Sequence, residues 1–84
     1  MITVKLFGTL RVDTGVKEVS VQGNRVKELY EPILAEILRR NPRCEITLKK
    51  LKSCNAAVNG TLSSPGTKLH DGDIVFLFPA VAGG

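Results

Sequence analysis

The sequence predicts an α+β fold in which one helix lies across one face of a mixed β-sheet. Apolar and polar residues alternate from Ile2 to Phe7, which is typical of a strand with one buried face. Residues 26–38 instead carry apolar side chains at intervals of three and four, which is typical of an amphipathic helix. With the apolar run at 74–78, this order of elements favours a sheet of four to five strands.

The first two strands are expected to pair as a hairpin. Ile2, Val4 and Leu6 lie on the face that the alternation predicts to be buried. Turn residues follow at 13–15, and alternation resumes over residues 18–22.

The main helix is expected over residues 26–38. Asn24 can cap its start, or Arg25 can do so with Glu28 three residues further on. Its apolar positions share one stripe: Val26, Leu29, Tyr30, Ile33, Leu34, Ile37 and Leu38.

Pro32 falls inside this pattern and predicts a kink or a restart. Proline lacks the N–H group that would donate to the carbonyl of Glu28, and its ring crowds the preceding turn. In a restart, Glu31 caps a new helix and Pro32 takes the first helical position, where a missing N–H costs nothing.

The C-terminal half is expected to contain loops and short strands. Residues 41–53 predict a basic, irregular loop, and residues 56–58 a short strand. The pair at 59–60, Asn-Gly, is typical of a tight hairpin turn, from which residues 61–62 return. The remaining segments are a loop at 63–66, a turn at 69–73 and the strand at 74–78.

Length and composition restrict the class of protein. A chain of 84 residues has room for one domain with a modest core, so a deep catalytic cleft is not expected. No apolar run approaches the ~20 residues that span a bilayer. The first residues begin a strand rather than a signal peptide, so we expect a cytoplasmic location and no membrane partner.

Few residues offer chemistry of their own. Cys44 and Cys54 lack CxxC spacing, so neither a metal site nor a disulfide is expected. His70 lies beside Asp71 and Asp73, which suits a metal or acid–base site, but these residues are also typical of a turn. The turn is favoured, because no second cluster of ligands lies elsewhere.

Half of the basic side chains lie in one segment of a chain with a net charge of +4. The segment has no aromatic residue on which a base could stack, so nucleic acid is not the expected partner. A solvated face or a docking surface for an acidic protein is favoured. Its residues are Arg39, Arg40, Arg43, Lys49, Lys50 and Lys52, against the single acid Glu45.

The strand at 74–78 is apolar at every position, so both of its faces need cover, as in a central strand. One helix covers only one face. Either one face, formed by Ile74, Phe76 and Phe78 or by Val75 and Leu77, stays partly exposed as a binding surface, or the loop at 41–53 folds over it.

The last six residues, 79–84, carry no charge and can span ~20 Å when extended. Such a segment can be a frayed end. It also suits a carboxylate that enters another protein's narrow channel, because Gly83 and Gly84 lack Cβ atoms and Pro79 fixes one dihedral angle where the strand ends.

Three segments together resemble the β-grasp sulfur carriers related to ubiquitin, which include the ThiS and MoaD proteins. The similarity is greatest to the MoaD-like small subunit of molybdopterin synthase. It is carried by Val58, Asn59 and Gly60, by Leu69, His70, Asp71, Gly72, Asp73, Ile74 and Val75, and by Phe78, Pro79, Ala80, Val81, Ala82, Gly83 and Gly84.

The resemblance implies a β-grasp domain at residues 1–78 and a flexible tail at 79–84. An ATP-dependent adenylating enzyme of the E1 type is then expected to activate the Gly84 carboxylate, which becomes a thiocarboxylate. The resemblance also implies a segment that threads the tail into the large synthase subunit, formed by Pro79, Ala80, Val81, Ala82 and Gly83. It implies that Phe76 and Phe78 lie near the docking surface.

The resemblance also implies a non-catalytic carrier without a permanently bound cofactor. The acyl-adenylate and the thiocarboxylate are transient. The carrier is expected to be a monomer when free and to form a heterotetramer with the large subunit. Related carriers that supply thiamine thiazole or tRNA thiolation, and modifiers that form isopeptide bonds with lysines, remain alternatives.

Overall fold

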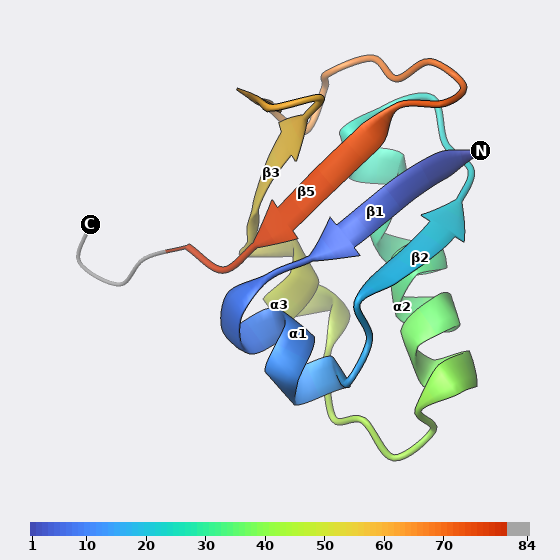
Figure 1. Cartoon of the computed structure of the whole chain (residues 1–84), viewed down its shortest axis with the longest axis vertical. Helices are drawn as coiled ribbons and strands as arrows, with labels where there is room; N and C mark the ends of the chain where they lie inside the picture. The colour runs from blue at the N-terminus through green and yellow to red at the C-terminus, as the bar shows by residue number, and fades with distance from the viewer. Residues whose placement is uncertain (81–84) are drawn as a thin grey trace.

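Five strands form one mixed sheet, with its helices packed mainly on one side (Figure 1). The computed structural model describes residues 1–80; Val81, Ala82, Gly83 and Gly84 lie outside the described residues. The strands are β1 (Ile2–Leu6), β2 (Glu18–Val21), β3 (Asn55–Val58), β4 (Thr61–Leu62) and β5 (Ile74–Phe78). The helices are α1 (Gly8–Thr14), the 3₁₀ turn η1 (Val26–Glu28), α2 (Tyr30–Arg40) and α3 (Leu48–Lys52).

The sheet has the order β2-β1-β5-β3-β4, so β5 is its central strand, as its apolar composition predicted. β1 runs antiparallel to β2 and parallel to β5. β3 runs antiparallel to both β4 and β5. The predicted hairpin at Asn59 and Gly60 is confirmed, with φ angles of 51° and 91° that suit its tight turn.

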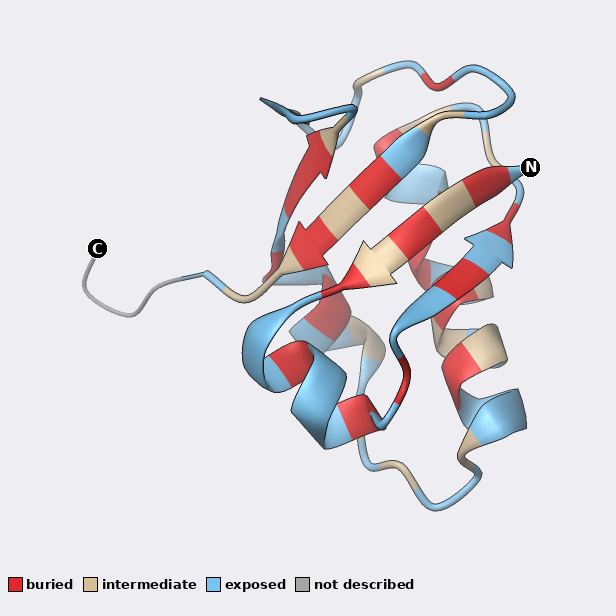
Figure 2. Cartoon of the chain, viewed as in Figure 1, coloured by how far each residue is buried: buried red, intermediate tan, exposed pale blue. Residues whose placement is uncertain are grey.

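The core lies between the sheet and α2 (Figure 2). Alternate residues of each long strand face it, including the predicted Ile2, Val4 and Leu6. Ile33 and Ile37 of α2 are buried against them, and Leu34 packs at the margin. The strand alternation is therefore confirmed, and so is the helical stripe except at Leu38, which is exposed.

Pro32 accompanies a restart of the helix, one of the two predicted outcomes. The chain makes η1, passes through Leu29, and begins α2 at Tyr30. Leu29 rather than Glu31 is therefore the N-cap residue, and Pro32 is the third helical residue rather than the first. Its missing N–H belongs to the first turn, whose N–H groups have no partner within the helix.

Helix α1 corrects the expectation of a turn at residues 13–15. Only Leu10 and Thr14 of this helix are buried, which is too few for a visible helical stripe. The buried Thr14 hydroxyl donates to the carbonyl of Leu10 at 2.8 Å. Gly15 ends the helix at φ 70°, in the left-handed region, where its N–H donates to the carbonyl of Arg11.

Helix α3 corrects the expectation of an irregular loop at residues 41–53. The Thr47 hydroxyl caps the helix by accepting a hydrogen bond from the backbone N–H of Lys50 at 3.2 Å. Leu51 is fully buried in the same core as Ile37 and Leu77. The segment therefore covers the side of the sheet that α2 covers.

Candidate functional site

The face of the sheet opposite α2 is open along the central strand. Val75 and Leu77 of β5 are buried in the core, so Ile74, Phe76 and Phe78 point to the other side. Of the two sequence-based alternatives for this strand, an exposed face is the one that the structure shows.

The strand register gives this face its composition. Ala57 of β3 pairs with Leu62 of β4 on one side and with Phe76 of β5 on the other. Phe76 in turn pairs with Lys5 of β1. These side chains lie on one face because paired residues of neighbouring strands point the same way. Leu62 is 73% exposed. The face is thus apolar at Leu62, Ala57 and Phe76, with the polar Asn55 beside Phe78. Towards β2 it is polar, where Glu18 pairs with Lys5.

The C-terminal segment begins at the edge of this open face, next to the start of α1. The backbone N–H of Phe7 donates to the carbonyl of Leu77 at 3.0 Å. The rings of Phe7 and Phe76 meet edge to face. Gly8 lies against Pro79, since a Cβ atom on Gly8 would stand 3.5 Å from Pro79 Cδ. Pro79 is thereby half-buried, whereas Ala80 is exposed.

The structure brings some of the sequence-predicted site residues together. Phe76 and Phe78 share the open face, and Pro79 and Ala80 follow them. The other predicted residues, Val81, Ala82, Gly83 and Gly84, lie outside the described part of the chain.

Two residues of this face were missed in the sequence. Phe7 belongs to it because it continues the outward face of β1, which the alternation in residues 2–7 already indicated. Leu62 belongs to it because the turn at residues 59–60 sets its pairing with Ala57.

The turn around His70 is polar but structural. The backbone N–H of His70 donates to Asp73 Oδ2 at 2.8 Å, and the side-chain amide of Asn59 donates to Asp73 Oδ1 at 3.0 Å. These hydrogen bonds hold the pKa of Asp73 below its ordinary value. The N-terminal ammonium of Met1 contacts Asp71 and lowers the pKa of that carboxyl in the same way.

Residues 1–80 contain no group of three or more His, Cys, Asp or Glu side chains placed to hold a metal ion. Both cysteines are free, and burial raises the pKa of the Cys54 thiol, which keeps it protonated at neutral pH. No helix among these residues is both long and apolar enough to cross a membrane.

The family model of the ThiS family matches residues 4–84, which is nearly the whole chain and includes the segment after β5. This chain belongs to the ThiS family. The predicted resemblance to β-grasp sulfur carriers is therefore confirmed, and the five-stranded sheet with its main helix is the ubiquitin-like β-grasp fold.

Solved structures support this assignment of family and fold. A putative molybdopterin converting factor subunit 1 from Pyrococcus furiosus is 33% identical, with a TM-score of 0.65, and the match covers 95% of this chain and 97% of that one. A chain in the complex of subunits 1 and 2 of the molybdopterin-converting factor from Helicobacter pylori is 30% identical, with a TM-score of 0.58, over 99% and 97% of the two chains.

A third structure, the small archaeal modifier protein 1 from Methanosarcina acetivorans, is 25% identical, with a TM-score of 0.65, over 99% of this chain and 95% of that one. No curated protein sequence matches the chain significantly. The similar structures thus include both converting-factor subunits and a modifier protein. They support a ubiquitin-like carrier of the ThiS family.

Proposed function

We propose that this ThiS-family chain carries sulfur as a thiocarboxylate on Gly84 and donates it in the synthesis of molybdopterin. The observation that carries the proposal is that the open apolar face, with Phe76 and Phe78, leads directly into the segment that begins at Pro79. The family match extends through that segment to Gly84. In this proposal residues 1–78 are the docking domain and residues 79–84 are the tail.

The proposed chemistry needs no catalytic group from the carrier. A carboxylate is a poor acyl donor, so an adenylating enzyme joins the Gly84 carboxylate to the AMP part of ATP and releases pyrophosphate. A donor that supplies sulfur at the oxidation level of sulfide then attacks the acyl carbon, the bond to AMP breaks, and AMP leaves behind a thiocarboxylate. The carrier contributes a docking face and a tail whose Gly83 and Gly84 lack Cβ atoms, which lets the backbone approach the reacting groups closely.

Molybdopterin synthesis is proposed as the recipient pathway because two of the similar structures bear the name of the molybdopterin-converting factor. The Helicobacter pylori structure is a complex of two different subunits. By analogy, we propose that the present chain docks through its open face on the large subunit of a molybdopterin synthase, in a cytoplasmic heterotetramer, and holds no permanent cofactor.

Mass spectrometry of the intact protein tests this function. The purified chain is incubated with the adenylating enzyme of its own organism, ATP and a sulfur donor. We expect one oxygen atom to be replaced by sulfur, and tandem spectra to place the change on Gly84. A variant with one alanine appended after Gly84 is the matched control, because it keeps the domain and moves the carboxylate. An unchanged mass of the parent chain, under conditions that load a known carrier, contradicts the proposal.

A second candidate function is protein modification through an isopeptide bond from Gly84 to lysines of target proteins. The similarity to the small archaeal modifier protein 1 favours it. Conjugates in cell extracts that disappear on deletion of Gly83 and Gly84 would support this function. Supplying the loaded carrier to a molybdopterin synthase, a thiazole synthase or a tRNA-thiolating enzyme identifies which reaction consumes the sulfur.

A further inference from the structure

The proposed function assigns no role to the basic segment at residues 39–52. The structure divides its cations into two groups. Arg39 and Arg40 are engaged within the fold: Arg39 Nη2 lies 2.8 Å from Glu36 Oε2, and Arg40 Nη1 donates to the carbonyl of Glu18 at 2.7 Å. Within residues 1–80, no ion pair involves the other four cations, which are all exposed: Arg43, Lys49, Lys50 and Lys52. We call these four residues the α3 patch.

The fold does not account for the α3 patch. Helix α3 is held by the buried Leu51, by Leu48 and Ile46 at the margin of the core, and by the cap from Thr47. A lysine near the end of an exposed helix contributes only about 0.3–1 kcal/mol through the helix dipole. Several close positive charges also repel one another. The concentration of charge is therefore better explained by a partner than by stability.

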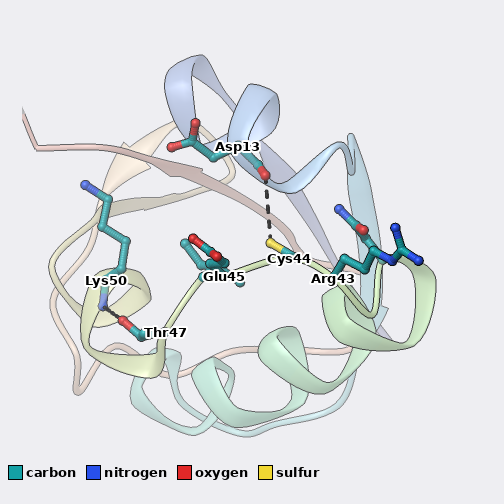
Figure 3. A pocket seen from close by; sticks show the side chains of 8 residues that line it. Asp13, Arg43, Cys44, Glu45, Thr47 and Lys50 are labelled. Atoms are coloured by element: carbon teal, nitrogen blue, oxygen red, sulfur yellow. Dashed lines mark hydrogen bonds between the residues drawn. The ribbon is translucent and has the colours of Figure 1, made fainter.

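A cavity beside the patch indicates what kind of partner fits. It has a volume of about 570 Å³ and lies between α1 and the segment that joins α2 to α3. Figure 3 shows Arg43 and Lys50 on opposite sides of this cavity, with Cys44 and Glu45 between them. Asp13 also lines it.

The two carboxylates in the cavity disfavour a polyphosphate chain, because they repel its charges. The patch and the cavity also lack aromatic side chains on which bases could stack. An acidic protein can instead pair single side chains with Lys49 and Lys52, which do not line the cavity, and need not enter it. The surroundings therefore favour an acidic protein over a nucleic acid.

The position of the patch connects it with the tail. Asn55, three residues after Lys52, pairs with Phe78, the last residue of β5. In Figure 1, α3 accordingly lies close to the end of β5 from which the C-terminal segment leaves. The patch belongs to the helical layer, on the opposite side of the sheet from Phe76. The patch and the start of the C-terminal segment thus lie at the same end of the sheet, where a partner that holds the tail can also reach the patch.

We propose that the α3 patch docks on an acidic surface of the adenylating enzyme, next to the channel that admits the tail. This inference rests on the proposed function. Complementary charge raises the rate of encounter and fixes orientation, and its effect falls with ionic strength. The apolar face then supplies contacts that salt does not weaken.

Charge reversal at one lysine tests the proposal. Lys49→Glu is compared with Lys68→Glu, which makes the same change of net charge at an exposed lysine on the loop before β5. We expect Lys49→Glu to lower kcat/KM for sulfur loading about tenfold at low ionic strength, through KM, with kcat unchanged. The defect should shrink at about 0.5 M salt, where the Debye length falls towards a few ångströms. Lys68→Glu should stay within about twofold of the parent chain.

Carbodiimide cross-linking provides a second readout, because it joins lysine amines to carboxylates that they contact. With the adenylating enzyme as the probe, we expect cross-links from Lys49, Lys50 or Lys52 to its acidic residues. Cross-links confined to Lys5, Lys17 or Lys68 would overturn the proposal. So would equal kinetic defects in Lys49→Glu and Lys68→Glu, or RNA binding at low salt that only Lys49→Glu abolishes while loading stays normal.

The two proposals fail in different ways. If the parent chain gains no sulfur, the proposed function fails, and the cross-linking result still decides where the enzyme binds. If the parent chain is loaded and Lys49→Glu is loaded equally well, only the α3 patch is excluded. Thermal unfolding of each variant, expected to match the parent chain, shows that the domain is intact.

Discussion

The rings of Phe7 and Phe76 meet edge to face, with their centroids 5.5 Å apart and their planes at 79°. Phe7 links β1 to α1, and Phe76 lies in β5, so the contact joins segments from opposite ends of the chain. It also lies where the open face adjoins the C-terminal segment. The contact therefore connects the stability of the domain with the shape of the proposed docking surface.

A double-mutant cycle should measure this contact. Phe7→Ala and Phe76→Ala are expected to be coupled by about 0.5–1.5 kcal/mol in the free energy of unfolding, as for other aromatic pairs. Denaturant unfolding of the two single variants and the double variant gives the value. The control cycle pairs Phe7→Ala with Leu62→Ala at the far edge of the sheet and should be additive within about 0.5 kcal/mol. Equal coupling in both cycles would contradict the assigned contact.

Replacing Pro32 should have little effect on stability. Its missing N–H lies in the first turn of α2, so Pro32→Ala is expected to change the free energy of unfolding by less than about 1 kcal/mol. Ala35→Pro, the reverse exchange in the interior of the same helix, should cost about 3 kcal/mol or more. Thermal or urea unfolding compares the two. A large change in Pro32→Ala would place the helix start elsewhere.

Substitution of Gly23 should destabilise the fold, because there is no room for a side chain at this position. A Cβ atom at this position would lie 2.7 Å from Cδ2 of Leu29, and Leu29 is itself buried. We expect Gly23→Ala to lower the free energy of unfolding by about 1–3 kcal/mol, as overpacking does. Gly66→Ala is the matched control: nothing lies within 4 Å of its added Cβ, and its φ is not positive. That variant should be neutral or more stable by up to about 1 kcal/mol.

Protonation of Asp73 should lower the stability of the fold at acid pH. Its pKa is lowered in the folded state, first by the backbone N–H of His70 and then by the amide of Asn59. Its stabilising contribution is therefore fully present above the unfolded pKa, near 3.8, and is lost as the pH falls through the lower folded pKa. Asp73→Asn should have a lower Tm than the parent chain at pH 7. The difference should shrink as the pH falls below 3.8, and a difference that grows in acid would contradict the assignment.

Leu51 should matter for stability although its helix is short. The side chain is fully buried in the core, so Leu51→Ala is expected to cost about 3 kcal/mol. Lys52→Ala, at the exposed neighbouring position, should stay within about 0.5 kcal/mol of the parent chain. Urea unfolding distinguishes the two. Similar losses in both variants would show that the charges, rather than the buried leucine, hold α3 in place.

The sequence predicted the elements whose periodicity is long and regular. Ile2, Val4 and Leu6 alternate cleanly, and the stripe through Ile33 and Ile37 repeats over several turns, so both faces were identified correctly. Residues 74–78 were placed at the centre of the sheet because an all-apolar strand needs neighbours on both edges and cover on its faces.

The two short helices escaped prediction because their stability comes from tertiary packing. Helix α3 buries a single residue, Leu51, and α1 buries Leu10 together with a polar residue, Thr14, so neither shows an apolar stripe. Because these helices were not predicted, the sequence alone did not show which segments cover the buried face of β5. For the site, alternation in residues 2–7 placed Phe7 on the outward side, but its contact with Phe76 depends on a parallel pairing that local patterns do not encode.

The parallel pairing of β1 with β5 makes one part of the open face depend on the joining of the two ends of the chain. Lys5 and Phe76 become neighbours only when the first strand finds the last, a contact of high sequence separation that slows folding relative to helical bundles. Before that step the contact between Phe7 and Phe76 does not exist, whereas the row of Leu62, Ala57 and Phe76 needs only β3, β4 and β5. A partner that recognises Phe76 beside Phe7 would therefore bind only molecules in which the two ends of the chain have paired.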